Sequence, residues 1–496
     1  MVMSVIQELA KVYRGKSQHL ALKTIFVGLI TGEPVLLIGP HGTFKSSMAA
    51  FVGRTMEKPV AVLSTDAKSF GDIEAFAESL GKEIGADPEV LMQNRALGVN
   101  VEYTDYPGYV RVKATVDLAR HKINADEKTA PISVFSAQIN DQMDPEDILG
   151  YAVHHKALLG NKPPHVIKTG KLSGADYVVL DEAFAAPRLM SKLHTAVNEK
   201  VVDTAIGPVP IAPLTFVFCT NPWNQFYQTN PKVVNAATLD RFLASCEVDA
   251  PSAAEILYTM NALKGYKILS RLPAQDLLAA REEADSVKIP SEIMRFCVGL
   301  VSALSSCYFS PTKDEIRDQR VSPFLIDKDC SICRYSKSIC AFANVGKVRS
   351  IASLMKVMKA SAFIEGRKEA GTEDLEFALK TALPHRMIFS QDYIFEKGTP
   401  HAASWDIVGR YAWMTKSFSE MIQKIMGITN AEEAAAVRTE VMDNPSLRAL
   451  VDDVIDAMKG SKKDELPADL LDSIRAFSPR QQQQQEKPGG EQNAKQ

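Results

Sequence analysis

The sequence lacks several features that would place it in a specialised class of proteins. Its net charge is only −3 over 496 residues, which gives no general electrostatic case for binding nucleic acid. Seven cysteines in this length do not suggest a secreted disulfide scaffold. The apolar runs Val35 to Ile38 and Tyr177 to Leu180 are far too short to span a bilayer, and MVMSVIQELAKVYRGKSQHL has no signal-peptide layout. We therefore expect a globular cytoplasmic protein of two or three domains.

Short apolar segments alternate with helical segments over the first half of the chain. EPVLLIG, PVAVLS, PISVFSAQI, DYVVLDEA and LTFVFCTN read as strands, whereas residues 1 to about 30 and KSSMAAFVGRTM read as helices. Strands that are apolar throughout are typical of a parallel sheet covered on both faces. The alternation predicts an α/β core with a central parallel sheet, which we place at residues 1–250.

The pattern changes after Pro251, where segments with helical periodicity follow one another. They are SAAEILYTMNALK, SEIMRFCVGLVSALSS, RSIASLMKVMKASAFIEGRKEA and TEDLEFALKTAL, the last with Thr372 as its expected N-cap. We expect an all-α domain over residues 251–395 and a C-terminal helical extension over residues 396–478. Residues 479–496 are low in complexity, and we expect a disordered tail there.

A glycine-containing turn joins the first strand to the helix that follows it. A phosphate-binding loop needs inward-facing backbone N–H groups, a lysine for the β- and γ-phosphates and a hydroxyl for Mg²⁺. Lys45 and Ser46 fit the last two needs, whereas Phe44 stands where such loops usually have glycine. An ordinary strand–turn–helix junction is the alternative. The candidate nucleotide-binding residues of the loop are Gly39, Pro40, His41, Gly42, Thr43, Phe44, Lys45, Ser46 and Ser47.

Two acids end the apolar strand of Tyr177-Val178-Val179-Leu180-Asp181-Glu182. Asp181 can hold Mg²⁺ together with Ser46 when ATP is bound, and Glu182 can polarise the attacking water. The alternative is that both acids only begin the next helix, where acids are favoured. Together with the loop, the pair favours a site for phosphoryl transfer.

Two further polar residues follow in an order that suits the same chemistry. Asn221 ends the strand in LTFVFCTNP and can hydrogen-bond the water or the γ-phosphate, although Asn is also common in turns before proline. Arg241 in LDRF can stabilise the charge of a transferring phosphoryl group on a neighbouring subunit, although a lone arginine is more often a surface cation.

The order of GPHGTFKS, DPEDILG, VVLDEAFAAP, FVFCTNP and LDRF resembles the MoxR family of AAA+ ATPases, in the branch with a helix-2 insert. The resemblance covers roughly residues 20 to 390. It implies that YAVHHKALLGNKPPHVIKTGKLSGAD contains the helix-2 insert and that EKVVDTAIGPVPIAPLTF forms a hairpin before the sensor-1 strand. It also implies an insertion at about residues 65–130, between PVAVLS and PISVFSAQI.

The resemblance implies a role for each motif residue. Lys45 and Ser46 belong to Walker A, Asp181 and Glu182 to Walker B, Asn221 is sensor 1, Arg241 is the arginine finger and Arg349 is sensor 2, with Pro384-His385-Arg386 at the usual end of the lid. It further implies a ring of identical subunits, expected to be a hexamer, that hydrolyses ATP with Mg²⁺ between subunits. Such a ring would remodel or mature a client protein, with a partner that carries a von Willebrand factor A domain.

Two other functions stay open. A nucleic-acid translocase is the first, because the minichromosome-maintenance helicases share the same inserts, but EKVVDTAIGPVPIAPL has one lysine against two acids and argues against DNA. A nucleotide-binding scaffold without hydrolysis is the second, suggested by Phe44 alone. The sequence contains no Ser/His/Asp or HExxH arrangement, so ATP hydrolysis is the only chemistry we assign.

A group of cysteines in the expected lid has the spacing of metal ligands. CxxC at Cys330 and Cys333 is followed by Cys340 and preceded by Cys307, which would suit zinc or an iron–sulfur cluster. Reduced thiols without a metal are the alternative. Cys219, Cys246 and Cys297 lie in apolar contexts and read as core residues.

Overall fold

The computed structural model describes residues 2–140, 142–143, 148, 150–153, 166–169, 172, 174–204, 207–222, 236–266, 271–305, 339, 342–426 and 431–440. The chain divides into two compact units. The first comprises Met1–Arg295 and Val348–Arg386, and the second comprises Phe296–Lys347 and Met387–Gln496.

A five-stranded parallel sheet forms the centre of the first unit. Its strand order is β13-β1-β12-β9-β6, from β1 (Val35–Ile38), β6 (Val134–Gln138), β9 (Tyr177–Asp181), β12 (Phe216–Thr220) and β13 (Ala244–Glu247). Val35 of β1 pairs with Val217 of β12 and with Ala244 of β13. This confirms the predicted α/β fold with a central parallel sheet. Because β1, β12 and β9 are adjacent and parallel, the residues that follow them meet at one edge.

Helices cover both faces of this sheet. Helices α2 (Lys16–Thr31) and α3 (Lys45–Arg54) pack on one face, where a Cβ added at Gly53 would lie 2.8 Å from the Tyr177 ring. Helix α7 (Pro187–Glu199) covers the other face, on which Leu180 and Phe218 join Leu193 in one buried cluster. Burial on both faces explains why these strands show no polar alternation.

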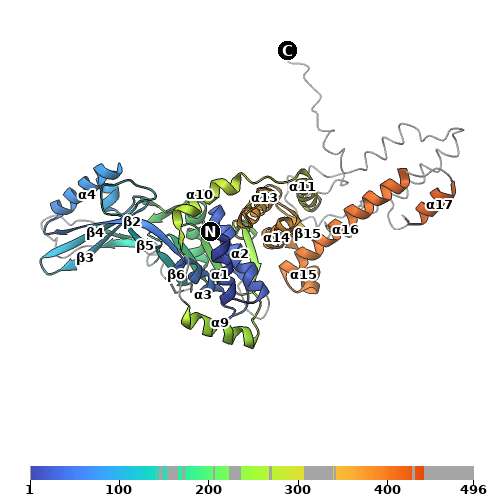
Figure 1. Cartoon of the computed structure of the whole chain (residues 1–496), viewed down its shortest axis with the longest axis horizontal. Coiled ribbons are helices and arrows are strands. Elements are labelled where there is room, and N and C mark those ends of the chain that lie inside the picture. The colour runs from blue at the N-terminus through green and yellow to red at the C-terminus, as the bar shows by residue number, and fades with distance from the viewer. Residues whose placement is uncertain are drawn as a thin grey trace, which may run out of the picture. The chain divides into compact units, whose positions relative to one another are not determined.

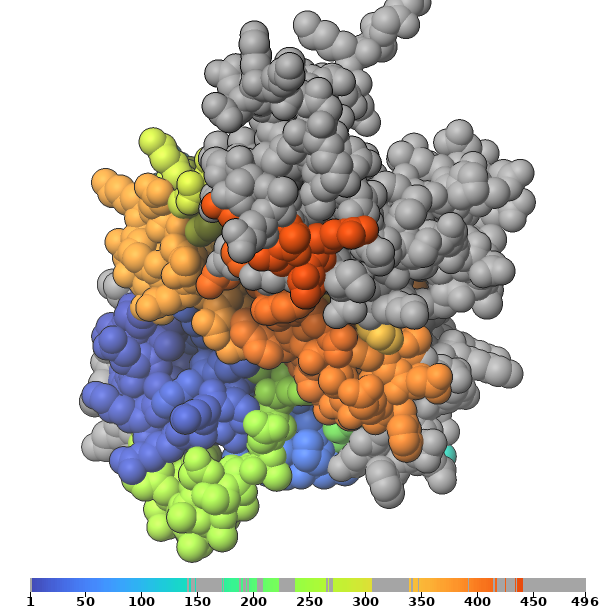
Figure 2. All heavy atoms as spheres, turned by 90° about the vertical axis from the view of Figure 1, so that its right-hand side faces the viewer, coloured from blue at the N-terminus to red at the C-terminus, as the bar shows by residue number. Residues whose placement is uncertain are grey.

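The N-terminal helix α1 (Val2–Val12) packs beside α9 (Ala253–Gly265), and Figure 2 shows α9 in yellow-green below the blue N-terminal residues. Thr259 donates its hydroxyl to the Val12 carbonyl at 3.0 Å, and the Tyr266 hydroxyl donates to Glu8 at 2.8 Å. Both contacts join the N-terminal helix to the segment that follows the last strand of the central sheet. Helix α1 is therefore fixed to the same body as the strands.

A second sheet is built mainly from the segment between α3 and β6, and it is seen at the left of Figure 1. Its order is β14-β2-β4-β3, with β5 also paired to β2, from β2 (Met56–Ala67), β3 (Val99–Tyr106), β4 (Tyr109–Asp117), β5 (Lys128–Pro131) and β14 (Leu272–Pro273). Helices α4 (Phe70–Ile84) and α5 (Pro88–Met92) connect β2 to β3. GYVRVKATVDL is confirmed as a strand, β4.

The placement of PVAVLS among the strands of the central sheet is wrong. This segment lies in β2, whose Val60 pairs antiparallel with Asp117 of β4. In the part of β2 that follows PVAVL, exposed and half-buried residues alternate, because only one face of this sheet is covered. In the central sheet, the strand that pairs with β9 on the side away from β12 is β6.

Two antiparallel hairpins lie in the segments in which the resemblance implied inserts. In the expected hairpin before β12, β10 (Val201–Thr204) pairs with β11 (Gly207–Pro210). In the expected helix-2 insert, β7 (Gly150–Val153) pairs with β8 (Val166–Thr169). Most of the rest of that insert and most of DPEDILG lie outside the described residues.

The described residues of the first unit also form α8 (Ala236–Leu239), α10 (Ala274–Asp285), α14 (Thr372–Ala382) and nearly all of α13 (Lys347–Ile364). Thr372 is not the N-cap of α14, because Gly371 has that position. The buried carboxylate of Asp374 accepts hydrogen bonds from the Gly371 N–H at 2.8 Å, from Arg367 and from Ser361. Asp374 therefore takes the capping role that we predicted for the Thr372 hydroxyl.

The described residues of the second unit are mainly helical. It contains most of α11 (Ser291–Ser305), together with α15 (Gln391–Lys397), α16 (Pro400–Met426), α17 (Ala431–Glu440) and the antiparallel pair β15 (Ala343–Val345) and β16 (Met387–Phe389). Tyr393 stacks on Phe342 and donates its hydroxyl to Asp406, which also accepts from Arg410 at 2.6 Å. The expected tail at residues 479–496 lies outside the described residues. Among the helices that are described, none has the length and apolar character needed to cross a membrane.

Candidate functional site

The loop between β1 and α3 has the backbone geometry of a phosphate-binding turn. Gly42 and Phe44 both have left-handed conformations, with φ of 78° and 65°. Such a conformation costs a residue with a side chain roughly 1–2 kcal/mol. Phe44 is the N-cap of α3 and makes no side-chain capping bond, so the first N–H groups of the helix are available to an anion.

Lys45 lies beneath this loop and is 6% exposed. Its ammonium donates to the carbonyl oxygens of Gly39 at 2.6 Å and Pro40 at 2.8 Å, and to the Thr43 hydroxyl at 3.2 Å. Burial lowers the pKa of Lys45, whereas the nearby Cys219, Asp181 and Glu182 raise it. The loop oxygens hold the ammonium in positions that phosphate oxygens can take over.

The acids and the amide predicted from the strand ends do come together. Asp181 ends β9, Glu182 follows it, and Asn221 follows β12 on the neighbouring strand. Asn221 Nδ2 donates to both carboxylate oxygens of Glu182, at 2.9 and 3.1 Å. Glu182 has φ of 51°, a strained conformation for a residue with a side chain and one that is frequent at functional sites.

His41 is a third member of this group. Its Nε2 lies 3.0 Å from Asn221 Nδ2, and its Nδ1 lies 3.6 Å from Glu182 Oε1. The sequence placed His41 in the phosphate loop but gave no sign of its contact with Glu182. That contact depends on β12 lying between β1 and β9, which is a property of the sheet order.

Arg241 and Arg349 lie at a second location in the first unit, around Asp240. Arg349 Nη1 contacts Asp240 Oδ2 at 3.0 Å, and Arg386 contacts Asp240 Oδ1 at 3.3 Å. Burial lowers the pKa of Arg386 to about 10, against the attraction of Asp240. Arg241 Nε is buried and has no hydrogen-bond partner in the described part of the chain. Neither Arg241 nor Arg349 hydrogen-bonds a phosphate-loop residue among the contacts of the described residues.

The sequence missed the role of His385 and Arg386, which it marked only as the end of the lid. The His385 ring contacts Ser245 Oγ and the Phe242 carbonyl, both at 2.9 Å, and Arg386 Nη2 donates to the carbonyls of Asp240 and Phe242. These two buried side chains hold the LDRF segment against the chain that follows α14. A basic pair next to a proline carried no local signal for this role.

The donor set at the strand ends suits Mg²⁺. Ser46 supplies a hydroxyl at the start of α3 and Asp181 a carboxylate at the end of β9, and hard oxygen ligands of this kind, with phosphate oxygens and water, are what Mg²⁺ prefers. Two ligands are typical, because Mg²⁺ keeps most of its water. The residues present therefore fit a Mg²⁺ ion that is bound together with phosphate oxygens.

The cysteines divide into two groups. Cys219, Cys246 and Cys297 are buried, as predicted, and burial raises the pKa of each thiol. Cys307, Cys330, Cys333 and Cys340 lie outside the described residues, so zinc or iron–sulfur binding there stays a prediction. The described residues contain no group of three or more potential metal ligands.

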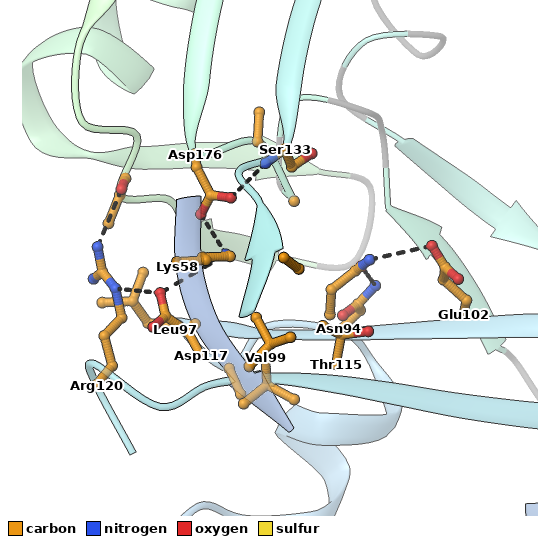
Figure 3. A pocket seen from close by; sticks show the side chains of 18 of the residues that line it. Lys58, Asn94, Leu97, Val99, Glu102, Thr115, Asp117, Arg120, Ser133 and Asp176 are labelled. Carbon is orange, nitrogen blue, oxygen red and sulfur yellow. Dashed lines mark hydrogen bonds and ion pairs between the residues drawn. The ribbon is translucent and has the colours of Figure 1, made fainter. Parts of the chain in front are cut away.

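A polar cavity of about 230 Å³ lies where the second sheet meets the central sheet, and Figure 3 shows it from close by. Asp176 stands between Lys58, at 2.6 Å, and the Ser133 N–H, at 2.7 Å. Asp117 contacts Lys58 at 3.8 Å and Arg120 at 3.5 Å. These charges compensate one another, so we interpret the cavity as the polar joint of the inserted sheet rather than as a ligand site.

The chain is similar to a family model and to solved structures. The family described as AAA lid domain matches residues 334–404. A crystal structure of a candidate ATPase from Cytophaga hutchinsonii is similar to 82% of this chain and to 93% of its own, at 17% identity and a TM-score of 0.52. A full-length MCM homologue from Methanopyrus kandleri is similar to 76% of this chain and 58% of its own, at 10% identity and a TM-score of 0.36.

No curated protein sequence matches the chain. At 17% identity the Cytophaga structure shows the fold alone, and the lid match adds the domain that follows the core. The order of the five parallel strands and the matched lid lead to one conclusion. The chain has the AAA+ fold, with an α/β core and an AAA lid domain.

Proposed function

We propose that this protein is a Mg²⁺-dependent ATPase of the AAA+ type. The observation that carries the proposal is the pair of hydrogen bonds from Asn221 to Glu182, at the sheet edge where the buried Lys45 and its loop also lie. A carboxylate, an amide and a lysine at the ends of three adjacent strands are the groups that phosphoryl transfer to water requires.

Each side chain has one task in this proposal. Lys45 exchanges the carbonyls of Gly39 and Pro40 for the β- and γ-phosphate oxygens of ATP. Glu182 orients and polarises the attacking water, and Asn221 keeps that carboxylate in place. Ser46 and Asp181 would hold Mg²⁺, which would supply positive charge to neutralise the phosphates.

We further propose that the active assembly is a ring, expected to be hexameric, in which Arg241 acts on the ATP of the neighbouring subunit. Among the described residues, the Nε of Arg241 is buried without a hydrogen-bond partner and no bond joins Arg241 to the phosphate loop, which supports a role outside its own site. By its resemblance to MoxR proteins, the ring would remodel a client protein with a partner that carries a von Willebrand factor A domain. A cytoplasmic location accords with this role.

Binding and turnover separate the assigned roles. Lys45→Ala should lose ATP binding, whereas Glu182→Gln should bind ATP, lose turnover and retain the ring in mass measurements. Glu78→Gln on the exposed face of α4 is the matched control and should behave as wild type. Single-stranded DNA should not raise the rate, and a clear rise would favour a nucleic-acid translocase. Turnover by Glu182→Gln at the wild-type rate would refute the assignment of the water-polarising group.

Mixed rings test the role of Arg241. Arg241→Ala and Glu182→Gln subunits should each be inactive alone. When they are mixed in equal amounts, about a quarter of the interfaces combine an intact Glu182 with an intact Arg241 from the neighbour. Activity should therefore reappear on mixing, and an inactive mixture of assembled rings would contradict a finger that acts between subunits.

A further inference from the structure

We propose that His41 is a positioning residue for ATP hydrolysis: it accepts a hydrogen bond from Asn221 and so couples the phosphate loop to Glu182. The proposal rests on the function proposed above and adds a residue to the same site. Its basis is the triangle formed by His41 Nε2 and Asn221 Nδ2 at 3.0 Å, His41 Nδ1 and Glu182 Oε1 at 3.6 Å, and Asn221 with both Glu182 oxygens.

The carboxylate fixes the direction of every hydrogen bond in this triangle. Ionised Glu182 only accepts, so the Asn221 atom beside it must be the amide nitrogen, because an oxygen there would be repelled at 2.9 and 3.1 Å. One Nδ2 proton goes to Glu182 and the second points to His41. His41 Nε2 therefore accepts, which leaves Nδ1, the ring nitrogen that lies towards Glu182, as the nitrogen that carries the proton.

This arrangement restrains Asn221 from two sides. Glu182 follows β9, Asn221 follows β12 and His41 belongs to the loop after β1, so the triangle ties together the ends of three strands. His41 is the member that belongs to the phosphate loop, and its side chain is 71% exposed, whereas that of Glu182 is 24% exposed. A change of the loop that accompanies ATP binding is thus transmitted through His41 to the group that orients the water.

Three substitutions of His41 separate hydrogen bonding from packing. His41→Phe keeps a ring but has no acceptor, and we expect kcat to fall on the order of fivefold, the value of about one net hydrogen bond. His41→Gln places an amide oxygen near the position of Nε2 and should restore most of the rate. The equilibrium dissociation constant of a fluorescent ATP analogue should change less than about twofold in all three variants, His41→Ala included, because Lys45 holds the phosphates.

A double-mutant cycle with Asn221 decides whether His41 acts through that residue. In the Asn221→Ala background His41→Phe should cause no further loss of kcat, because the acceptor has lost its donor. An additional fivefold loss there, an unchanged or faster His41→Phe enzyme, or a failed rescue by glutamine would each overturn the proposal. So would a dissociation constant that rises in proportion to the loss of rate.

The wild-type protein distinguishes this inference from the proposed function. If wild type hydrolyses ATP and Lys45→Ala does not, the proposed function stands whatever the His41 variants show. If assembled wild-type protein binds ATP without turnover, the proposed function fails and this inference fails with it. The His41 substitutions are expected to fold, since the ring lies on the surface.

Discussion

Phe44 is the position at which a substitution should most directly reveal the conformation of the phosphate loop. Its φ of 65° costs roughly 1–2 kcal/mol for any residue with a Cβ. Its ring lies 6.4 Å from the buried ring of Tyr13, edge to face, a contact of about 1 kcal/mol. Phe44→Ala loses the ring contact and keeps the strain, whereas Phe44→Gly loses both.

At an ordinary helix position the alanine variant is more stable than the glycine variant, whereas at position 44 we expect the glycine variant to be more stable. Relief of strain favours glycine, and the larger entropy of the unfolded glycine chain opposes it by about 0.5–1 kcal/mol. We expect Phe44→Gly to exceed Phe44→Ala by about 0.5–1 kcal/mol in the free energy of unfolding of the first unit, measured by urea denaturation. The same order should hold for ATP affinity.

An exposed helix position provides the control. At Glu78 in the interior of α4, the free energy of unfolding of Glu78→Ala should be about 1 kcal/mol higher than that of Glu78→Gly. Opposite signs at positions 44 and 78 would establish that the effect belongs to the backbone of the loop. If Phe44→Ala were as stable as Phe44→Gly, the left-handed conformation at Phe44 would be wrong.

Three other substitutions test contacts outside the phosphate loop. Arg386→Ala should cost about 3 kcal/mol of unfolding free energy, since it leaves buried carbonyls unpaired, whereas exposed Arg349→Ala should cost less than about 1 kcal/mol. Asp176→Ala should cost roughly 2 kcal/mol and make the inserted sheet more accessible to limited proteolysis, because Lys58 and the Ser133 N–H lose their shared partner. Burial raises the pKa of Asp406, but the hydrogen bonds from Tyr393 and Arg410 lower it by more than burial raises it, so the pKa lies below its ordinary value. The stabilisation by Asp406 is therefore present above the pKa of the unfolded state and is lost as the pH falls through the pKa of the folded state. The change in tryptophan fluorescence below about pH 4 should be partly removed in Asp406→Asn but not in the control Asp392→Asn.

The central sheet and its strand-end residues could be predicted because they leave local marks in the sequence. Strands buried on both faces must be apolar throughout, and polar residues at their ends then stand out, as Asp181, Glu182 and Asn221 do. PVAVLS is also apolar over a few residues, and its antiparallel pairing with Lys113 to Asp117 of β4 shows that it belongs to another sheet. Pairing between distant segments is not visible in so short a run.

The contacts that the sequence missed depend on strand order and on the lid. His41 reaches Glu182 because β12 separates β1 from β9 and its Asn221 bridges the gap. Arg386 meets Asp240 because the chain after α14 returns to β13. Neither relation follows from periodicity or spacing, since each joins residues more than a hundred positions apart in the sequence.

The two arginines on Asp240 differ in a way that reconciles the observed ion pair with the sensor role that the resemblance to MoxR proteins implies for Arg349. Arg386 is buried, with 3% of its side chain exposed, and its additional bonds to the Asp240, Phe242 and Ala382 carbonyls make it a permanent anchor. Arg349 is 62% exposed, and its contact is an exposed ion pair worth about 0–1 kcal/mol, less than a charge-assisted bond to phosphate. Arg349 can therefore leave Asp240 for a nucleotide at little cost while Arg386 keeps Asp240 in place. Since Asp240 precedes Arg241, that exchange would change the charge beside the proposed finger without moving its backbone.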